Sequence, residues 1–293
     1  MRGRIVRGIG GFYYVKTDET REIYECRARG IFRKNLKKPL VGDVVDREIT
    51  DAGDMEGSIV NIYDRRNFLI RPAAANVDQA MVIFALASPE PLPGLLDRFL
   101  IRERYEGIPV IICMNKTDLA GEEKRRLFSE IYSISGSELL FISAKTLEGE
   151  DELRGCLKGK VTVLSGPSGV GKSTIINMLT NSRRRQTGEV SRKLKRGKQT
   201  STDAELIELN EDTFIIDTPG FSSLDIPDID ALDLQDYYPE IAARRGGCFF
   251  SGCSHTHEPK CAVRSALESK EISMERYASY SNIYEELSNR RKY

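Results

Sequence analysis

The first seventy residues alternate apolar and polar side chains over short stretches. The alternation is partial, and glycines and charged residues separate four stretches at Arg4–Val15, Glu22–Arg29, Val41–Ile49 and Ser58–Tyr63. Alternation between turn residues is typical of half-buried β-strands. We therefore predict a small β-barrel over residues 1–70. The Val41-Gly42-Asp43 strand entry favours an OB-like barrel, with an SH3-like barrel as the alternative.

From about residue 71 the pattern changes to continuous apolar runs and amphipathic stretches. The runs indicate buried strands at Ala80–Ala87, Pro109–Met114, Glu138–Ile142 and Lys160–Ser165. Helical spacing occupies Leu95–Tyr105, Glu122–Tyr132, Leu147–Leu157 and Lys172–Leu179, and two more strands are expected at Ala204–Leu209 and Thr213–Ile216. Alternating strands and helices are typical of a parallel sheet covered by helices. Residues 71–224 are thus predicted to form an α/β domain.

The last part of the chain differs in sequence pattern from the two regions before it. After Phe221 it is acidic and irregular, then rich in cysteine, then helical from about Ile272. We expect a small α domain over residues 225–293. No apolar run approaches the ~20 residues that cross a membrane. The N-terminus leads into an alternating segment and not into a signal-peptide core, so we expect a cytoplasmic protein.

The overall composition is ordinary, but the charged residues are unevenly distributed along the chain. The 293 residues are 40% hydrophobic and 30% charged, with a formal net charge of zero, as in ordinary globular proteins. Basic residues nevertheless cluster within the first fifty positions and at Arg183, Arg184, Arg185, Arg192, Lys193, Lys195, Arg196 and Lys198. Clustered positive charge attracts a polyanion such as RNA, and the alternative is a solvated loop.

The strongest motif lies between a predicted strand and a predicted helix. It fits G-x-x-x-x-G-K-[ST], and with the next residue it comprises Gly166, Pro167, Ser168, Gly169, Val170, Gly171, Lys172, Ser173 and Thr174. Glycines let backbone N–H groups surround phosphates at a helix N-terminus. Lys172 would reach the β and γ phosphates, and Ser173 would bind Mg²⁺. The motif predicts a nucleotide site without choosing the base.

A second motif makes that choice. Asn115, Lys116, Thr117 and Asp118 follow an apolar strand, at the sheet edge where α/β proteins bind ligands. The Asp118 carboxylate can accept hydrogen bonds from N1–H and the 2-amino group of guanine. Adenine offers neither, and ATP would leave the carboxylate unpaired. The spacing therefore favours GTP over ATP and argues against an ATPase or a nucleotide kinase.

Two weaker motifs gain value from their positions after strands. Ser143, Ala144 and Lys145 follow one predicted strand and would support the guanine base. Asp217-Thr218-Pro219-Gly220 follows another, where Asp217 suits Mg²⁺ and the Gly220 N–H suits the γ-phosphate. In an ordinary small GTPase the phosphate loop comes first, whereas here it follows the guanine motifs. The motif order is circularly permuted, and a fold tolerates such permutation where its termini lie close together.

Three cysteines and one histidine have the spacing of a metal site. Cys248, Cys253, His255 and Cys261 form C-x₄-C-x-H-x₅-C. Three thiolates and one imidazole suit tetrahedral Zn²⁺, and four protein ligands make such an ion structural. His257 is the rival imidazole. In a cytoplasmic protein such a cluster is more often metal-binding than disulfide-bonded.

Together these motifs resemble the bacterial ribosome-small-subunit-dependent GTPase A family over nearly the whole chain. The resemblance implies an N-terminal OB domain, a circularly permuted GTPase domain and a C-terminal zinc domain with the same four ligands. It also implies a GTPase that acts late in maturation of the small (30S) ribosomal subunit, contacts ribosomal RNA and is stimulated by the subunit. We expect GTP or GDP with Mg²⁺, one structural Zn²⁺ and a monomer.

The resemblance also directs attention to the segment between the phosphate loop and Asp217. The family carries a G-[RK]-H-T-T-like sequence, and here the segment reads Gly197-Lys198-Gln199-Thr200-Ser201-Thr202. Thr200 is the first choice for a hydroxyl near Mg²⁺, with Ser201 and Thr202 as alternatives. Gln199 replaces the histidine and could orient water through its amide. Phe221 cannot do so, and slow intrinsic hydrolysis is therefore expected.

Alternative functions remain open at this point. The first is a GTP-controlled binding switch for another RNA or protein, with incidental hydrolysis. The second is an RNA-binding zinc protein with a degenerate nucleotide site, which would fail to bind GTP.

Overall fold

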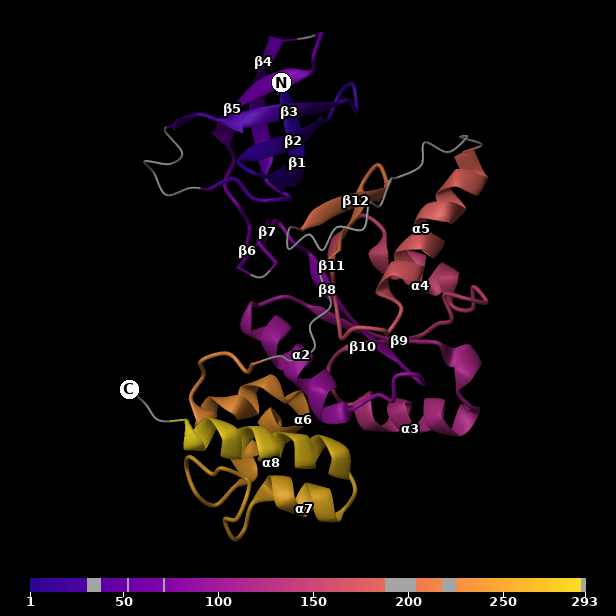
Figure 1. Cartoon of the computed structure of the whole chain (residues 1–293). Helices are drawn as coiled ribbons and strands as arrows, with labels where there is room; N and C mark the ends of the chain where they lie inside the picture. Colours follow the sequence, from indigo (N-terminus) through magenta and orange to yellow (C-terminus); the bar gives the residue numbers. More distant parts are fainter. Residues whose placement is uncertain (31–37, 52, 71, 188–203, 218–224, 291–293) are drawn as a thin grey trace. The chain divides into compact units, whose positions relative to one another are not determined.

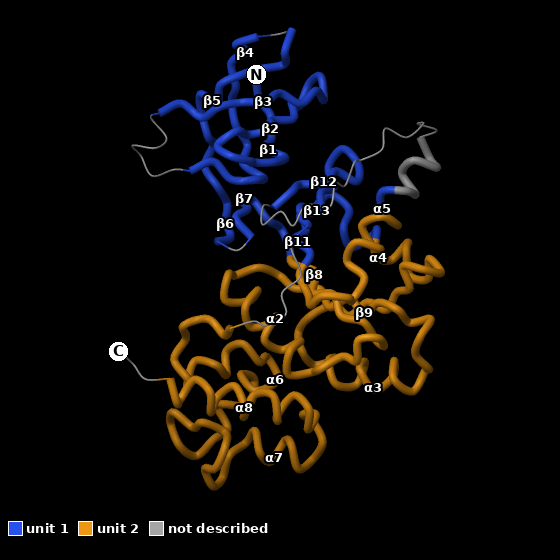
Figure 2. Tube along the Cα trace, viewed as in Figure 1, with its two compact units in different colours: residues 1–79, 154–164, 179–219 blue, residues 80–153, 165–178, 220–293 orange. Residues whose placement is uncertain are grey.

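The computed structural model describes residues 1–30, 38–51, 53–70, 72–187, 204–217 and 225–290. Contacts between Cα atoms divide the chain into two compact units (Figure 2). The first unit comprises residues 1–79, 154–164 and 179–219, and the second comprises residues 80–153, 165–178 and 220–293. The domain boundaries expected from the sequence, after residues 70 and 224, stay a prediction.

The N-terminal part of the first unit is a closed five-stranded barrel (Figure 1). Its strands are β1 (Arg2–Ile9), β2 (Phe12–Thr17), β3 (Ile23–Ala28), β4 (Val44–Asp51) and β5 (Glu56–Ile62). Their order is β1-β2-β3-β5-β4, and a pairing of Gly3 with Val45 joins β1 to β4 and closes the barrel. Only β3 and β5 run parallel among these pairs. The predicted OB-like barrel is confirmed.

One stretch expected as a single segment is a hairpin. Arg4–Val15 contains Gly10 and Gly11, whose φ angles are 58° and 88°, and the chain reverses there between β1 and β2. Glycine adopts positive φ without the penalty of a Cβ, and two such residues form the tight turn that matches strand twist. The reversal pairs Ile5 with Val15 inside the barrel core.

The rest of the first unit adds short strands. β6 (Phe68–Leu69) pairs with β7 (Ala74–Ala75). β11 (Val161–Ser165) runs parallel to β13 (Thr213–Asp217), and β12 (Glu205–Asn210) is antiparallel to β13. A pairing of Arg7 with Glu205 joins β12 to β1 of the barrel. The two strands expected after residue 203 are therefore present and form a hairpin.

The second unit contains a parallel sheet. Its strands are β8 (Gln79–Ala85), β9 (Val110–Asn115) and β10 (Glu138–Phe141), in the order β10-β9-β8. Helices α2 (Pro93–Tyr105) and α3 (Glu122–Tyr132) contribute Leu96, Phe99 and Phe128 to a core with these strands. Every residue of β9 is buried, which explains its continuous apolar sequence. Helices α4 (Glu150–Leu157) and α5 (Lys172–Thr187) follow in the chain, and each has residues in both units.

The C-terminal region of the second unit is made of short helices. They are the 3₁₀ turns η2 (Ala231–Tyr237) and η3 (Arg245–Gly247) and the helices α6 (Pro239–Ala242), α7 (Ala262–Glu268) and α8 (Met274–Asn289). Their core contains Ile241, Val263 and Ile283, together with Ile101 from α2. The region is therefore an α domain, as predicted, and it packs on α2 (Figure 1).

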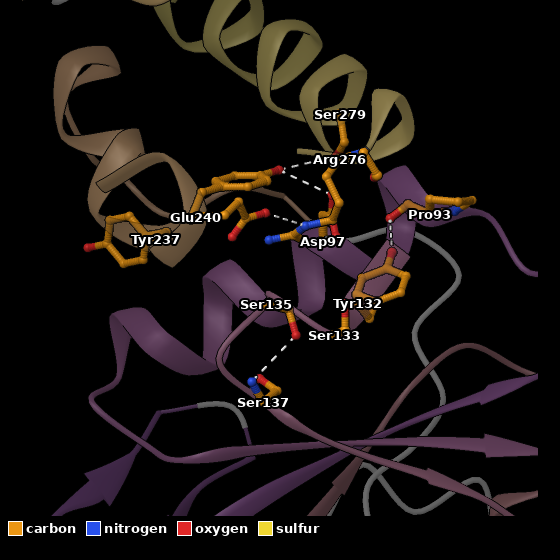
Figure 3. Close-up of polar contacts among 12 residues, drawn as sticks. Pro93, Asp97, Tyr132, Ser133, Ser135, Ser137, Tyr237, Glu240, Arg276 and Ser279 are labelled. Atoms are coloured by element: carbon orange, nitrogen blue, oxygen red, sulfur yellow. Dashed lines mark hydrogen bonds and ion pairs between the residues drawn. The ribbon is translucent and has the colours of Figure 1, made fainter. Parts of the chain in front are cut away.

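A buried ion cluster lies in this contact (Figure 3). Arg276 of α8 donates to Oε1 of Glu240 at 2.6 Å through Nε, and to Asp97 of α2 through Nη1. All three side chains are at most 1% exposed. Burial raises the pKa of Asp97, while the Arg276 charge opposes that rise. One guanidinium thus holds two carboxylates in the interior.

Candidate functional site

The phosphate-binding loop connects β11 to α5, as its motif predicts. The φ angles of Gly166 and Gly171 are 139° and 100°, a region that favours glycine. A Cβ on Gly166 would lie 2.2 Å from the Ile83 carbonyl oxygen, and a Cβ on Gly171 would lie 2.4 Å from Nδ2 of Asn115. These two glycines therefore let the loop lie against β8 and against the guanine motif.

Lys172 lies at the start of α5, beneath the loop. Its side chain is buried, and Nζ donates to the carbonyl oxygens of Gly166 at 2.6 Å and Pro167 at 2.8 Å. The next residues, Ser173 and Thr174, are exposed in the first helical turn. An ammonium group and a helix N-terminus thus converge where the loop can hold an anion.

Asn115 joins the three motifs of this unit. It is the last residue of β9, and its side chain is buried. Its Oδ1 accepts from the backbone N–H of Ala144 at 3.1 Å, and its Nδ2 donates to the carbonyl oxygen of Val170 at 2.9 Å. One amide therefore ties the N-K-T-D motif to the S-A-K motif and to the phosphate loop.

Lys116 makes a second connection to the phosphate loop. Its backbone is left-handed, with φ 64°, and Nζ donates to the carbonyl oxygen of Gly169 at 2.7 Å and to that of Ser88. Ser88 lies in the loop between β8 and α2. Nothing in the local sequence marks Ser88, because only its backbone oxygen takes part.

The residues predicted to recognise the base follow β9 and β10. The turn η1 (Thr117–Leu119) presents Asp118, whose Oδ1 accepts from the Ser143 hydroxyl at 2.7 Å. Nζ of Lys145 lies 3.8 Å from Oδ2 of the same carboxylate, and the Lys145 side chain is mostly exposed. The two motifs thus meet in space, and one hydrogen bond and one ion pair hold the Asp118 carboxylate in place.

Glu148 and Arg125 also belong to this site, although neither was predicted from the sequence. Glu148 accepts from the Thr117 hydroxyl at 2.7 Å and from Arg125 of α3 at 3.0 Å. The hydrogen bond from Thr117, followed by that from Arg125, lowers the pKa of Glu148 below its ordinary value. Neither residue belongs to a motif, and their meeting depends on how α3 packs beside β10.

Other predicted residues are not brought together by what the structure describes. Asp217 ends β13 in the first unit. The switch candidates Gln199, Thr200, Ser201 and Thr202 lie outside the described residues, as do Gly220 and Phe221. Their roles stay predictions.

The four predicted metal ligands form one cluster. Their ligand atoms all lie within 4.8 Å of one another. Nδ1 of His255 lies 3.5 Å from Sγ of Cys248 and 3.4 Å from Sγ of Cys261, and these two sulfurs are 3.9 Å apart. Thiolates at ~2.3 Å around a tetrahedral Zn²⁺ are about 3.8 Å apart, so the donor set fits zinc.

The surroundings orient the histidine. Nε2 of His255 lies 3.1 Å from Oε1 of Gln235, which leaves Nδ1 to face the cysteines. Burial lowers the pKa of His255, which favours the neutral form that binds metals. The rival His257 is exposed and contacts Thr256. The geometry therefore supports His255 over His257.

Helix α8 holds the cluster loop from one side. The hydroxyl of Tyr277 donates to the carbonyl oxygen of His255 at 2.8 Å, and that of Tyr280 donates to the carbonyl oxygen of Ser254 at 3.0 Å.

Across the ranges that the structure describes, no helix has the length and apolar character needed to cross a membrane.

Comparisons with known proteins match the chain along its full length. A sequence model of the RsgA N-terminal domain matches residues 2–59, and one of the RsgA GTPase matches residues 62–227. Proteins named small ribosomal subunit biogenesis GTPase RsgA are 47% identical in Agathobacter rectalis and 46% identical in Clostridium acetobutylicum. Each of these matches covers 100% of both chains.

Solved structures agree with this assignment. The crystal structure of YjeQ from Thermotoga maritima has a TM-score of 0.82 at 35% identity, covering 99% of each chain. The structure of YloQ, described as a circularly permuted GTPase, has a TM-score of 0.79 at 35% identity, covering 100% of this chain and 96% of the other. The motif order, the barrel, the cysteine–histidine cluster and these matches place the chain in the RsgA GTPase family.

Proposed function

We propose that this protein hydrolyses GTP as a cytoplasmic maturation factor of the small ribosomal subunit. The observation that carries the GTP assignment is the convergence of Asp118, Ser143 and the phosphate loop in one unit. The names of relatives that match the whole chain support the ribosomal role.

Guanine recognition rests on Asp118. Its carboxylate would accept from N1–H and the 2-amino group of the base, while Ser143 and Asn115 hold the two loops at the correct spacing. Adenine would leave this acceptor unpaired, which disfavours ATP.

Phosphate binding rests on the loop and on Lys172. The ammonium group now bonds to two loop carbonyls and would exchange them for β- and γ-phosphate oxygens. Ser173 and Thr200 would hold Mg²⁺, with Asp217 as a further candidate ligand, and the ion would offset phosphate charge. The Gly220 N–H would contact the γ-phosphate.

Hydrolysis is expected to need the ribosomal partner. The residue after Gly220 is Phe221, which cannot orient water. Gln199 is the candidate for that task through its side-chain amide. We therefore propose slow hydrolysis by the isolated protein and stimulation by the small subunit, whose ribosomal RNA would contact the barrel and the basic cluster of Arg183 to Lys198.

The remaining proposals concern metal and assembly state. One structural Zn²⁺ would be held by Cys248, Cys253, His255 and Cys261, because four protein ligands leave no open position. The protein would act as a monomer.

The test is hydrolysis of GTP by the purified protein, alone and with small ribosomal subunits, with ATP as the control nucleotide. We expect slow GTP turnover alone and a large increase with subunits, and no comparable turnover of ATP. Fast turnover by the isolated protein would contradict the incomplete catalytic site. Tight GTP binding without stimulation would instead favour a GTP-controlled switch for another partner.

A further inference from the structure

The N-K-T-D and S-A-K loops are fastened to each other by several hydrogen bonds. Asn115 contacts the N–H of Ala144, Asp118 contacts the Ser143 hydroxyl, and the Thr117 N–H donates to the carbonyl oxygen of Ile142 at 3.2 Å. Each of these bonds involves a residue of the two motifs or a strand end. Glu148, which belongs to neither motif, makes further hydrogen bonds to both loops.

Glu148 bonds to the S-A-K loop through its backbone and to the N-K-T-D loop through its side chain. Its carbonyl oxygen accepts from the Ser143 N–H at 3.0 Å and closes the turn that carries S-A-K. Its Oε2 accepts from Oγ1 of Thr117 at 2.7 Å. Thr117 is buried and immediately precedes Asp118. The backbone of Glu148 thus fixes one loop, and its side chain fixes the other.

The turn around Glu148 has little freedom. Gly149 follows it with φ 73°, and a Cβ there would lie 2.7 Å from the Phe141 carbonyl oxygen. The Ser143 hydroxyl that donates to Asp118 also accepts from the Thr146 N–H at 3.1 Å. Arg125 meets the other oxygen of the Glu148 carboxylate at 3.0 Å, so the carboxylate is held on both sides.

We infer that Glu148 is a positioning residue for guanine recognition, acting on Asp118 through the Thr117 hydroxyl. This inference rests on the proposed guanine site. Glu148 does not touch the base. It sets the distance between the loop that carries the acceptor and the loop that supports it, and an acceptor held in advance costs less to order when the base binds.

The inference predicts an effect on base affinity and base choice rather than on turnover. Glu148→Ala should weaken GDP binding about tenfold, the range for a hydrogen bond to a charged group at a partly exposed site. Glu148→Gln should stay within about threefold of the parent, because its amide oxygen can accept from the same hydroxyl. The kcat for GTP with saturating small subunits should stay within about twofold, because the hydrogen bonds of Glu148 go to Thr117, Arg125 and Ser143 and not to the phosphate loop.

A comparison of GDP with IDP separates positioning from mere stability. Inosine lacks the 2-amino group that Asp118 would contact, so the parent protein should prefer GDP. A displaced Asp118 should narrow that preference in Glu148→Ala. Glu122→Ala is the matched control, because Glu122 is 90% exposed and lies 3.8 Å from Arg125. Its removal takes a carboxylate from the same arginine and leaves Thr117 untouched.

The measurement is fluorescence titration of the full-length variants with GDP and IDP, alongside their thermal unfolding. A lower melting temperature with an unchanged GDP-to-IDP ratio would overturn the inference. A parent protein without guanine preference would instead overturn the proposed base site itself. If Glu148→Ala fails to fold, Thr117→Val and Thr117→Ser decide. Loss of affinity in the valine variant alone supports the inference, and equal affinities overturn it.

Discussion

Asn115 illustrates how a single side chain can serve several motifs. Its amide bonds to both Ala144 and Val170, in segments that follow it by 29 and 55 positions. A carboxylate at this place could accept from Ala144 but could not donate to Val170. The asparagine is therefore required by the arrangement of backbone groups around it, before any nucleotide is considered.

The proposed contact of Asp118 with guanine predicts that Asp118→Asn changes the base preference of the protein. Asp118→Asn exchanges one acceptor oxygen for a donor NH₂, which suits the O2 carbonyl of xanthine and not the 2-amino group of guanine. We expect GTP affinity to fall about 10- to 100-fold and XTP affinity to rise. Titration with GTP and XTP measures both. Equal losses for the two nucleotides would argue against direct contact with the base.

Among the elements, α2 serves two cores. Leu96, Phe99 and Leu100 face the core of the parallel sheet, whereas Asp97 and Ile101 face the C-terminal helices. Arg104 extends the second face, with Nη1 donating to the Tyr237 carbonyl oxygen at 2.6 Å. A helix buried on two sides has no wide polar face, and its polar residues are there to meet partners on the other element.

The ion cluster on this face predicts a large loss of stability when its cation is removed. Arg276→Met leaves Asp97 and Glu240 buried without a counter-charge, at a cost of about 3–5 kcal/mol. Arg245→Met is the control, because Arg245 pairs with Asp236 at the surface, where both side chains are 53% exposed. That pair is worth at most about 1 kcal/mol. Urea unfolding compares them, and similar losses would refute the importance of burial.

The same variant should have an altered pH dependence. Burial raises the pKa of Asp97, and removal of the opposing Arg276 charge raises it further. The folded variant then binds a proton more readily than the unfolded chain, so its stability increases as the pH falls through the folded pKa. The loss caused by Arg276→Met should be smaller at pH 5 than at pH 8. A loss that is constant over this range would show that Asp97 stays charged.

Zinc should matter most for the C-terminal helices. The cluster loop joins η3 to α7, and Cys253 and Cys261 belong to the hydrophobic core of this region. Removal of zinc by a chelator should increase hydrogen exchange in α7 and in the cluster loop and leave the barrel strands unchanged. His255→Ala should abolish the one bound zinc, and His257→Ala should retain it. Unchanged exchange after complete zinc removal would contradict a structural metal.

For the whole molecule, a net charge of zero conceals separate basic and acidic stretches. A protein that meets RNA through some surfaces needs a local excess of positive charge there, whatever the total. The acidic stretch between Asp225 and Glu240 instead includes η2 and the start of α6 in the C-terminal region.

The basic cluster predicts a salt dependence of subunit binding. Replacement of Arg183, Arg184 and Arg185 by glutamine should weaken binding and reduce the slope of log K against log salt by about 2–3, since each lost phosphate contact contributes roughly 0.7–0.9. Arg126→Gln, on the exposed face of α3, is the control. An unchanged slope in the triple variant would exclude this cluster from the RNA contact.

Features that depend only on neighbouring residues could be predicted from the amino-acid sequence. Continuous apolar runs predicted β8 and β9, and the phosphate loop was predicted between β11 and α5. The four predicted zinc ligands lie within fourteen consecutive residues, and their spacing alone indicated a metal site, in which the ligand atoms lie within 4.8 Å of one another. Such features are predictable because their chemistry is local. The hairpin between β1 and β2 was not predicted, because the residues on both sides of Gly10 and Gly11 continue the same alternation and together resemble one segment.

Contacts between residues that are distant in the chain became visible only in the folded protein. Glu148 meets Thr117 across 31 positions, and Arg276 meets Asp97 across 179. No local pattern distinguishes these charged residues from the many that face solvent, because their partners are set by how helices pack on the sheet. The closure of the barrel by β1 and β4 and the packing of the C-terminal helices on α2 arise in the same way. The sequence therefore supplied the chemistry of the site, and packing selected the residues that hold it in place.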